Sequence, residues 1–247
     1  QKEQVILFLN RRGHSTFVFC RECGYALHCP HCDVSLTYHL ARNILRCHYC
    51  DYHNRPPDEC PNCKSRYIKY SGLGTQKVED ELTRLLPGIR IARMDADAMQ
   101  GKDATQRVYE KLKNKEIDLL IGTQMVAKGL DLPDVTLVGV IMADTCLNIP
   151  DYRASERTFQ LMTQVAGRAG RGLKPGKVIL QTFNPEHYSI RTAARHDYLQ
   201  FYAQEIAWRE REKYPPYTDF LKISVTGPDQ KSVMEQAAEI AELCRDT

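Results

Sequence analysis

Residues 135–142 read VTLVGVIM, a continuous apolar run that decides the fold of this chain. Such a run is typical of a strand buried on both faces, as in a parallel sheet between two layers of helices. The segments on either side alternate: 89–94 (strand), 103–114 (helix), 117–121 (strand), 154–169 (helix) and 177–182 (strand). Alternating strands and helices predict an α/β fold with a parallel sheet covered on each face.

The same pattern extends toward the N-terminus with a gap in it. Residues 4–10 and 15–20 are short apolar, strand-like runs, and the chain returns to a strand-like run only at 67–70, followed by a helical pattern at 78–86. Between them, residues 20–67 are rich in Cys, His, Tyr, Arg and Pro and lack a hydrophobic run. Such a stretch is not expected to bury a core of its own, so it needs another source of stability.

The C-terminal part is expected to belong to a different domain. After Pro185 an amphipathic pattern runs to Lys213, then a strand is expected at 220–225 and a helix at 229–244. A single βα unit cannot close a domain, and the chain starts without Met, so the sequence is interpreted as a fragment with a truncated C-terminal domain. The expected division is 1–19 with 68–184, an insertion at 20–67, and a linker helix with the start of an α+β domain at 185–247.

Eight of the ten cysteines lie in the insertion, as four Cys-x-x-Cys pairs: Cys20/Cys23, Cys29/Cys32, Cys47/Cys50 and Cys60/Cys63. Zinc binds four thiolates as a tetrahedron, and this spacing presents two of them on one turn. The eight thiols therefore predict two closed, structural zinc sites, each stabilising the fold by about 10–16 kcal/mol. We call residues 20–67 the cysteine module.

The sequence indicates less directly which two cysteine pairs share one zinc site. Sequential pairing would join 20/23 with 29/32, whereas nested pairing would join 20/23 with 60/63 and 29/32 with 47/50. Nesting is favoured because the outer site would close the insertion where the insertion leaves residues 1–19 and 68–184, which we call the sheet lobe. With eight thiols available, none of the module's five histidines is expected to be a ligand. The other two cysteines, Cys146 and Cys244, are expected to be core thiols because free Cys is usually buried.

The aromatic and basic residues of the module permit two interpretations. Tyr38, Tyr49, Tyr52 and His53 could stack on bases, with phosphate contacts from a basic set: Arg42, Arg46, Arg55 and Lys64. The same residues could instead pack the zinc turns, and the sequence does not separate these alternatives.

Two segments carry phosphate-handling patterns. Residues 121–134, IGTQMVAKGLDLPD, begin at a strand end, where ligands bind in open α/β sheets, although they could form an ordinary loop. Residues 164–172, QVAGRAGRG, place Arg168 and Arg171 three residues apart, expected on one helix face. Guanidinium groups so placed suit the charge of a transferring phosphoryl group, the role of an arginine finger.

The sequence has no P-loop and no Asp-Glu pair after a strand that would hold magnesium. It therefore carries arginines suited to act on a nucleotide without the cradle that binds one, and the isolated chain is expected to be inactive in nucleotide hydrolysis. The net charge of only +3 does not by itself indicate a nucleic-acid partner. No apolar run approaches the roughly 20 residues of a membrane span, so a cytoplasmic location is expected.

These segments resemble a known family. Residues 164–171 resemble motif VI of superfamily 2 helicases, and 121–134 resemble their motif V. Residues 5–13, VILFLNRRG, look like motif IV of the PriA family of replication-restart helicases, and the four-pair cysteine insertion follows. Further matches are Gly72-x-Gly74-Thr75 and the string from Asp144 through Pro150-Asp151-Tyr152-Arg153 to Arg157.

The resemblance implies a RecA-like second lobe of an ATP-driven, 3′→5′ DNA helicase that acts as a monomer on forked DNA and single-strand/duplex junctions. Its implied cofactors are two zinc ions, with ATP and Mg²⁺ in the complete enzyme. Its implied partners are primosome proteins and single-stranded DNA-binding protein. The nested zinc pairing also holds in that family.

The resemblance also assigns roles to individual residues. Arg168 and Arg171 would face the γ-phosphate with Gln164 assisting. Asp131 would touch the ribose, with Gly129 and Gly167 beside the nucleotide. Thr123, Gln124 and Lys128 would contact DNA. Two alternatives are a zinc-dependent interaction module on a non-catalytic α/β scaffold, and an RNA-directed motor of the same superfamily, which the cysteine insertion disfavours.

Overall fold

The computed structural model describes residues 3–9, 18–39, 42–70, 75–95, 98–99, 103–123, 132–170, 174–221 and 223–245. The chain divides into two compact units, residues 1–208 and 209–247. Within the described part, no helix has the length and apolar character to cross a membrane.

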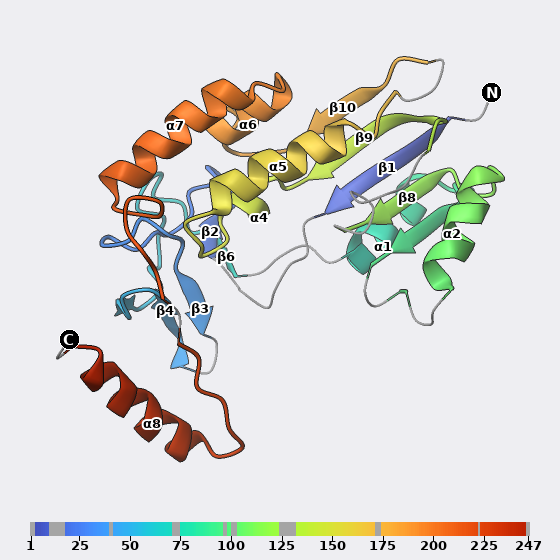
Figure 1. The fold of residues 1–247 in the computed structure, drawn as a ribbon. Coiled ribbons are helices and arrows are strands. Elements are labelled where there is room, and N and C mark those ends of the chain that lie inside the picture. The colour runs from blue at the N-terminus through green and yellow to red at the C-terminus, as the bar shows by residue number, and fades with distance from the viewer. Residues whose placement is uncertain are drawn as a thin grey trace. The chain divides into compact units, whose positions relative to one another are not determined.

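A five-stranded parallel sheet is the centre of the first unit (Figure 1). Its strands in spatial order are β10 (Lys177–Leu180), β9 (Val135–Ile141), β1 (Gln4–Leu9), β8 (Leu119–Gly122) and β7 (Ile91–Met94). All four neighbouring pairs are parallel. The predicted α/β fold with a parallel sheet is confirmed, and the apolar run that led to the prediction is β9.

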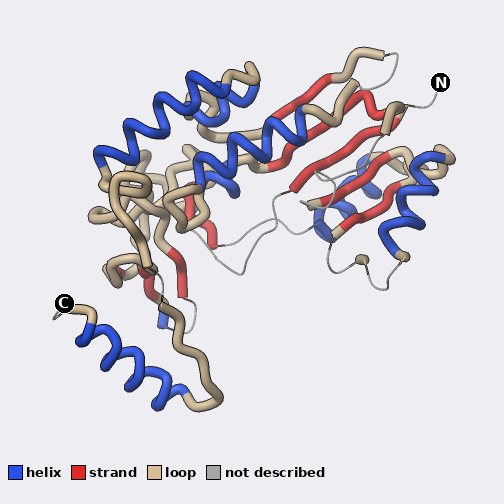
Figure 2. The backbone as a smooth tube through the Cα atoms, in the orientation of Figure 1, coloured by secondary structure: helices blue, strands red, loops and turns tan. Residues whose placement is uncertain are grey.

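Alternating side chains of β1 enter two different cores, because successive residues of a strand point to opposite faces. Ile6 and Phe8 belong to the larger core, whereas Val5 and Leu7 pack on the other face. Five helices contribute to the larger core: α2 (Ala104–Lys113), α4 (Asp144–Leu147), α5 (Ala154–Ala166), α6 (Tyr188–Ala194) and α7 (Tyr198–Arg211). The opposite face is covered by α1 (Thr75–Leu85). Helices therefore lie on both faces of the sheet (Figures 1 and 2).

The parallel strands all start at one side of the sheet and end at the other, and we call these sides its amino edge and its carboxyl edge. The two have different neighbours. At the carboxyl ends of β9 and β10, Met142 packs against Phe19, which directly precedes the cysteine module, and the Phe19 and Phe183 rings lie 6.2 Å apart. Helix α5 runs from this end to the opposite one (Figure 1), where Gly170 donates its N–H to the carbonyl of Val135, the first residue of β9, at 3.1 Å. The start of α5 thus lies beside the module, and its end lies at the amino edge of the sheet.

The cysteine module leaves the sheet lobe through an antiparallel pair, β2 (Val18–Cys20) with β6 (Ile68–Tyr70). Inside it, β3 (Thr37–His39), β4 (Ile44–Arg46) and β5 (His53–Asn54) form a small antiparallel sheet. The expectation that this stretch buries no core is wrong. Three apolar residues of the module and two of its cysteines form one small core together with Val18 at its entry: Val18, Cys29, Val34, Leu36, Leu45 and Cys47.

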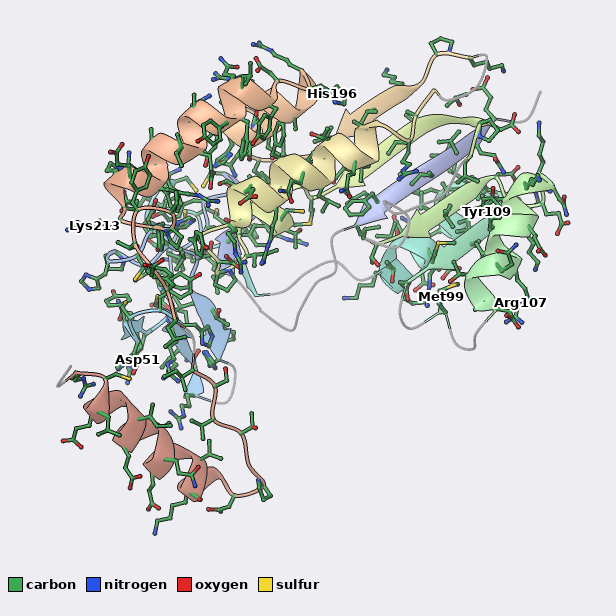
Figure 3. All side chains as sticks on the ribbon, in the orientation of Figure 1. Asp51, Met99, Arg107, Tyr109, His196 and Lys213 are labelled. Carbon is green, nitrogen blue, oxygen red and sulfur yellow. The ribbon has the colours of Figure 1, made fainter. Side chains whose placement is uncertain are left out.

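The single linker helix expected after Pro185 is also wrong. The chain forms α6 and α7, and the break lies at His196, whose φ of +52° ends the first helix (Figure 3). The N–H of His196 bonds to the carbonyl of Ala193, and that of Asp197 to the carbonyl of Thr192. These bonds close the last turn of α6, so the amphipathic pattern continues on a second axis.

Two further expectations fail in the C-terminal part. The described residues of 220–225 form no strand, because a strand needs a neighbour to satisfy its backbone groups and this segment pairs with none. The helix expected at 229–244 is confirmed as α8 (Gln230–Leu243). Cys146 is buried as expected in α4 (Asp144–Leu147), but Cys244 is exposed because it follows α8, whose described side chains are mostly exposed in this chain.

Candidate metal centres and motif segments

The eight module cysteines gather into two groups of four sulfur atoms. One group is Cys20, Cys23, Cys60 and Cys63, and the other is Cys29, Cys32, Cys47 and Cys50. Within each group all Sγ atoms lie within 4.8 Å of one another. The structure therefore places the pairs in the nested arrangement, not the sequential one. Each group joins one cysteine pair from the start of the module to one from its later half.

The sulfur spacing fits a tetrahedral zinc ion. Four thiolates about 2.3 Å from one zinc ion stand about 3.8 Å from each other. The measured separations are 3.5 Å for Cys20–Cys63, 3.7 Å for Cys23–Cys60 and 3.5 Å for Cys29–Cys50. A disulfide would require about 2.05 Å, and all ten cysteines are free thiols. The donors thus match the chemistry that zinc prefers.

All four cysteine pairs begin the same backbone turn. The first cysteine of each pair donates its N–H to the carbonyl five residues later: Tyr25, Val34, Tyr52 or Ser65. The residue after the second cysteine always has a positive φ: Gly24 (+72°), Asp33 (+48°), Asp51 (+61°) and Lys64 (+60°). Three of these four residues are not glycine, so the turn itself tolerates a side chain. This repeat presents two sulfurs on one side of each turn.

Among the described residues, the two sulfur groups consist of cysteines alone. The module's histidines have other contacts. His31 lies edge-on to Tyr52 with ring centroids 5.5 Å apart, and His39 lies 5.3 Å from His48. His28 lies within 3.5 Å of the Asp33 carboxylate. These rings pack around the metal-binding turns.

The aromatic residues that could have stacked on bases have mostly structural contacts. Tyr38 and Tyr52 pack against the module core, and the guanidinium of Arg46 pairs with Asp51. Tyr49 reaches the sheet lobe instead, where its hydroxyl oxygen accepts the N–H of Tyr152 at 3.2 Å. Packing within the module therefore accounts for two of the four ring positions, Tyr49 contacts the sheet lobe, and His53 is exposed.

The arginine-rich segment lies at the end of α5, beyond its last helical turn. Helix α5 ends at Ala166 with Gly167 as C-cap, and the N–H of Arg168 bonds to Val165 in a tighter turn. The expectation that Arg168 lies on the face of a regular helix is wrong, because α5 ends before it at the Gly167 C-cap. Gln164 is exposed and Arg168 is half-buried. Arg171 lies outside the described residues.

The backbone geometry requires a glycine at position 170. Its φ is +73°, and a Cβ atom there would stand 2.5 Å from the backbone nitrogen of Gly176. In turn, a Cβ on Gly176 would stand 2.2 Å from the nitrogen of Gly170. Two backbone segments are in contact at this point, so these glycines permit the chain to turn back into β10.

The other phosphate-handling segment begins at the carboxyl end of β8. Thr123 is half-buried, and its N–H bonds to the carbonyl of Met94 at 3.3 Å. Four residues with predicted roles, Gln124, Lys128, Gly129 and Asp131, lie outside the described residues. Thr123 therefore lies at the carboxyl edge of the sheet, and Arg168 at the amino edge.

A buried carboxylate that was given no role in the sequence interpretation fixes the loop after β9. Asp144 is only 3% exposed, and its carboxylate accepts hydrogen bonds from the Phe183 N–H (3.0 Å), the Thr182 hydroxyl (3.1 Å) and the Asn184 amide (2.7 Å). Its carbonyl accepts the side-chain amide of Asn148, whose oxygen faces the Ser35 hydroxyl of the module at 3.5 Å. The position of Asp144 at the end of an apolar run was the available signal.

A second carboxylate holds the start of α5. Asp151 pairs with Arg153 at 3.0 Å and with Arg157 at 2.8 Å. Burial opposes ionisation, but the hydrogen bonds and charges of these arginines outweigh it and hold the pKa of Asp151 below its usual value. Burial raises the pKa of the neighbouring Tyr49, which therefore stays a neutral phenol. The module is thus held against the helix that leads to Arg168.

Comparisons with known proteins define the class. Residues 65–172 match the helicase conserved C-terminal domain, and residues 29–55 match the cysteine-rich region domain of PriA DNA helicase. The fold and the two sulfur groups therefore define a helicase C-terminal lobe with a zinc-ribbon insertion.

Named relatives narrow this class. The chain is 51% identical over 97% of its length to Replication restart protein PriA of Bacillus subtilis, 49% over 99% to that of Synechocystis, and 42% over 99% to that of Chlamydia pneumoniae. It covers 30%, 30% and 33% of those proteins, about a third of their length. Nearly the whole chain is thus similar to about a third of each of these PriA proteins.

Proposed function

We propose that this chain is the second motor lobe and zinc module of an ATP-dependent, 3′→5′ DNA helicase that acts at stalled replication forks and initiates primosome assembly. The observation that carries the proposal is the pair of nested four-sulfur groups inserted after the first strand of a parallel-sheet lobe. The relatives that share this region at 42–51% identity are named replication restart proteins.

The cysteine module supplies stability and position in this proposal. Each four-sulfur group would hold one structural zinc ion, and a closed set of four thiolates leaves no coordination position for water. The zinc ions would therefore fold the module without taking part in catalysis. The domain boundaries at 19/20, 67/68 and 184/185 stay predictions.

The motif segments would supply the contacts with ATP and with DNA. Arg168 and Gln164, at the amino edge, would contact the γ-phosphate of a Mg²⁺-bound ATP held by another lobe, together with Arg171; Asp131, Gly129 and Gly167 would lie beside the nucleotide. Thr123, at the carboxyl edge, would contact DNA together with Gln124 and Lys128. Helix α5 has 13 residues, about 20 Å, and connects the module contact at Tyr152 with the turn of Arg168.

The proposed surroundings follow the family. The substrate would be forked DNA with single-strand/duplex junctions, the partners primosome proteins and single-stranded DNA-binding protein, and the acting form a cytoplasmic monomer. The relatives' names support the restart role, and the partner set is an extension of it.

A chimera tests the proposal. This chain would replace the matching segment of the Bacillus subtilis relative, and ATP hydrolysis and unwinding of forked DNA would be measured. Arg168→Ala is expected to lower ATP turnover by about 1,000-fold because an arginine finger stabilises the transition-state charge. Arg107→Ala, an exposed arginine on α2, is the matched control (Figure 3).

Three outcomes would contradict the proposal. Unchanged turnover in the Arg168→Ala chimera would favour the interaction module on a non-catalytic scaffold. Robust ATP hydrolysis by the isolated 247-residue chain with forked DNA would contradict the division of the active site between lobes. Stronger competition by single-stranded RNA than by DNA would favour the RNA-directed motor.

A further inference from the structure

A cavity of about 390 Å³ lies where the cysteine module meets the sheet lobe. We call it the junction cavity. Its wall on the module side is the segment Gly24–Ser35, and its other walls are the loop before α5, the loop after β10 and the single tryptophan, Trp208. Its volume lies within the range of about 300–1,000 Å³ that is usual for small-molecule sites.

Contacts across the junction fix the cavity walls. Phe183 fits against Gly24 so closely that a Cβ at Gly24 would stand 2.0 Å from the Phe183 Cβ. The indole N–H of Trp208 donates to the Asp33 carboxylate at 3.3 Å, which joins α7 to the module. The cavity therefore exists only when the module is folded and docked.

The lining combines flat rings with neutral hydrogen-bonding groups. Four large aromatic residues contribute: Tyr25, Tyr152, Tyr188 and Trp208. Asn148, Ser155 and Asn184 add amide and hydroxyl groups. Ala154 and Ser155 are also the first residues of α5, and the N–H of Ala154 is already bonded to the carbonyl of Asp151 at 2.9 Å, so the side chains supply the donors of this wall.

The histidine in the wall adds a donor. His187 accepts the N–H of Ser189 at Nδ1, at 3.3 Å, and burial lowers its pKa to about 4. The ring is therefore neutral near pH 7, and its proton lies on Nε2. A ligand that presents both acceptors and donors on a flat ring matches this set of groups.

The distribution of charge excludes a phosphate inside the cavity. Among the residues that the structure describes, the lining includes neither Lys nor Arg, and it includes the carboxylates of Asp33 and Asp151. Two guanidinium groups stand next to the lining instead. Arg153 lies 5.3 Å from the ring centroid of Tyr152, and Arg153 and Arg157 both keep over 40% of their side chains exposed. A neutral flat group would enter, and its attached phosphates would stay at the rim.

The cavity also lies at the edge of the sheet where Thr123 ends β8, because its lobe walls follow the carboxyl ends of β9 and β10. We propose that the junction cavity accepts one unstacked base of single-stranded DNA, whose phosphates pass Arg153 and Arg157. The proposal deepens the DNA contact of the proposed function and rests on it. Stacking on aromatic rings binds any base, so little sequence preference is expected.

Trp208 provides the readout, because it is the only tryptophan and lines the cavity. The zinc-loaded 247-residue chain would be titrated with a fluorophore-labelled 12-nucleotide single strand and with an abasic strand of the same length and charge. The strand with bases is expected to quench Trp208 emission and to bind about tenfold more tightly than the abasic strand.

Two variants remove the base-dependent part of binding by different routes. Tyr25→Ala deletes a stacking ring, and Ser155→Phe fills the cavity from α5; each is expected to reduce the tenfold difference to less than twofold. Their matched controls are Tyr67→Ala in the same module and Gln160→Phe on the same helix, both exposed and outside the lining. Zinc content checks that each variant is folded.

The outcomes separate this proposal from the broader one. Equal binding of both strands with unchanged Trp208 emission would overturn the base site and leave a phosphate-mediated DNA contact. Absence of binding by either strand would overturn the DNA contact of this chain together with the cavity proposal. A tenfold difference that persists in both Tyr25→Ala and Ser155→Phe would place the base elsewhere.

Discussion

The cysteine module and the sheet lobe differ in what holds each of them together. In the lobe, residues such as Phe8, Leu120 and Val138 are almost fully buried, and helices cover both faces of the sheet. The buried apolar set of the module and its entry at Val18 has only six members, and two of them, Cys29 and Cys47, are predicted zinc ligands. The lobe is stabilised chiefly by apolar burial, whereas the module depends on its sulfur groups.

This difference shows which parts of the structure are determined by short stretches of sequence. The four turns of the module are alike because each Cys-x-x-Cys pair forms the same backbone hydrogen bond. The strands are alike because each apolar run is buried in the same sheet. The junction between module and lobe has no such repeat. It consists of single contacts, such as Asp144 with its loop and Gly24 with Phe183. The predictions below act first on the module and then on the junction.

The largest effect is expected from loss of one zinc site. Cys29→Ser should reduce the zinc content from two ions to one per chain and destabilise the module by about 10 kcal/mol, because a structural zinc site contributes most of the folding free energy of such domains. Metal analysis and limited proteolysis of residues 20–67 measure both effects. The control is Cys146→Ser, a buried thiol outside both groups. Two bound zinc ions in Cys29→Ser would contradict the assigned ligand set.

Asp144→Ala is expected to have the largest effect at the junction. It leaves the Phe183 N–H, the Thr182 hydroxyl and the Asn184 amide without their buried acceptor, which should lower the free energy of unfolding by about 4 kcal/mol. Denaturant unfolding of the zinc-loaded chain measures it. Asp134→Ala, which removes a surface pair with Lys115, should cost less than about 1 kcal/mol. Equal costs would show that the Asp144 contacts do not hold the junction.

The sequence predicted the repetitive parts of the structure because their signals are local. The five strands and the helix of residues 230–243 follow from apolar periodicity, and the four turns follow from ligand spacing. Nested pairing was favoured from the need to close the insertion at the lobe, and the sulfur positions agree with it. Arg168 was recognised by its motif, but its position beyond the end of α5 depends on Gly167 and Gly170.

The failures have a common physical origin in long-range contacts. The module core joins Val18 to Leu45, and the cavity wall joins Asp33 to Trp208, so neither appears in any short window. The expected strand at 220–225 had the right composition, but composition cannot supply a neighbouring strand. Cys244 was assigned to a core by its apolar neighbours in sequence, although it is exposed here.

Gly24→Ala sharpens the distinction between turn geometry and junction packing. The positive φ alone should cost about 1 kcal/mol, and the contact with Phe183 should raise the loss of unfolding free energy to about 3 kcal/mol. Gly88→Ala is the matched control, because Gly88 has a φ of +86° and nothing within 4 Å of the added atom. Phe183→Ala in the Gly24→Ala background should recover part of the loss. Equal costs at Gly24 and Gly88 would show that only the turn matters.

The smallest expected effect is a pH dependence at the junction. Burial, aided by the charge of His28 and opposed by that of Asp144, lowers the pKa of His187 from 6.5 to about 4. Between these values the unfolded chain binds a proton that the folded chain does not, so the free energy of unfolding falls as the pH falls. The loss should be about 2 kcal/mol between pH 7 and pH 5.

His187→Asn should remove this component while an amide oxygen still caps α6 in place of Nδ1. His196→Asn is the matched control, because His196 is exposed and Asn tolerates its positive φ. Protonation of the zinc thiolates affects all three proteins alike, so the difference between their pH profiles isolates the histidine. Parallel profiles for His187→Asn and the parent chain would mean that water or a counter-charge reaches His187. The junction would then be an open surface, and the contrast with the closed core of the sheet lobe would be greater still.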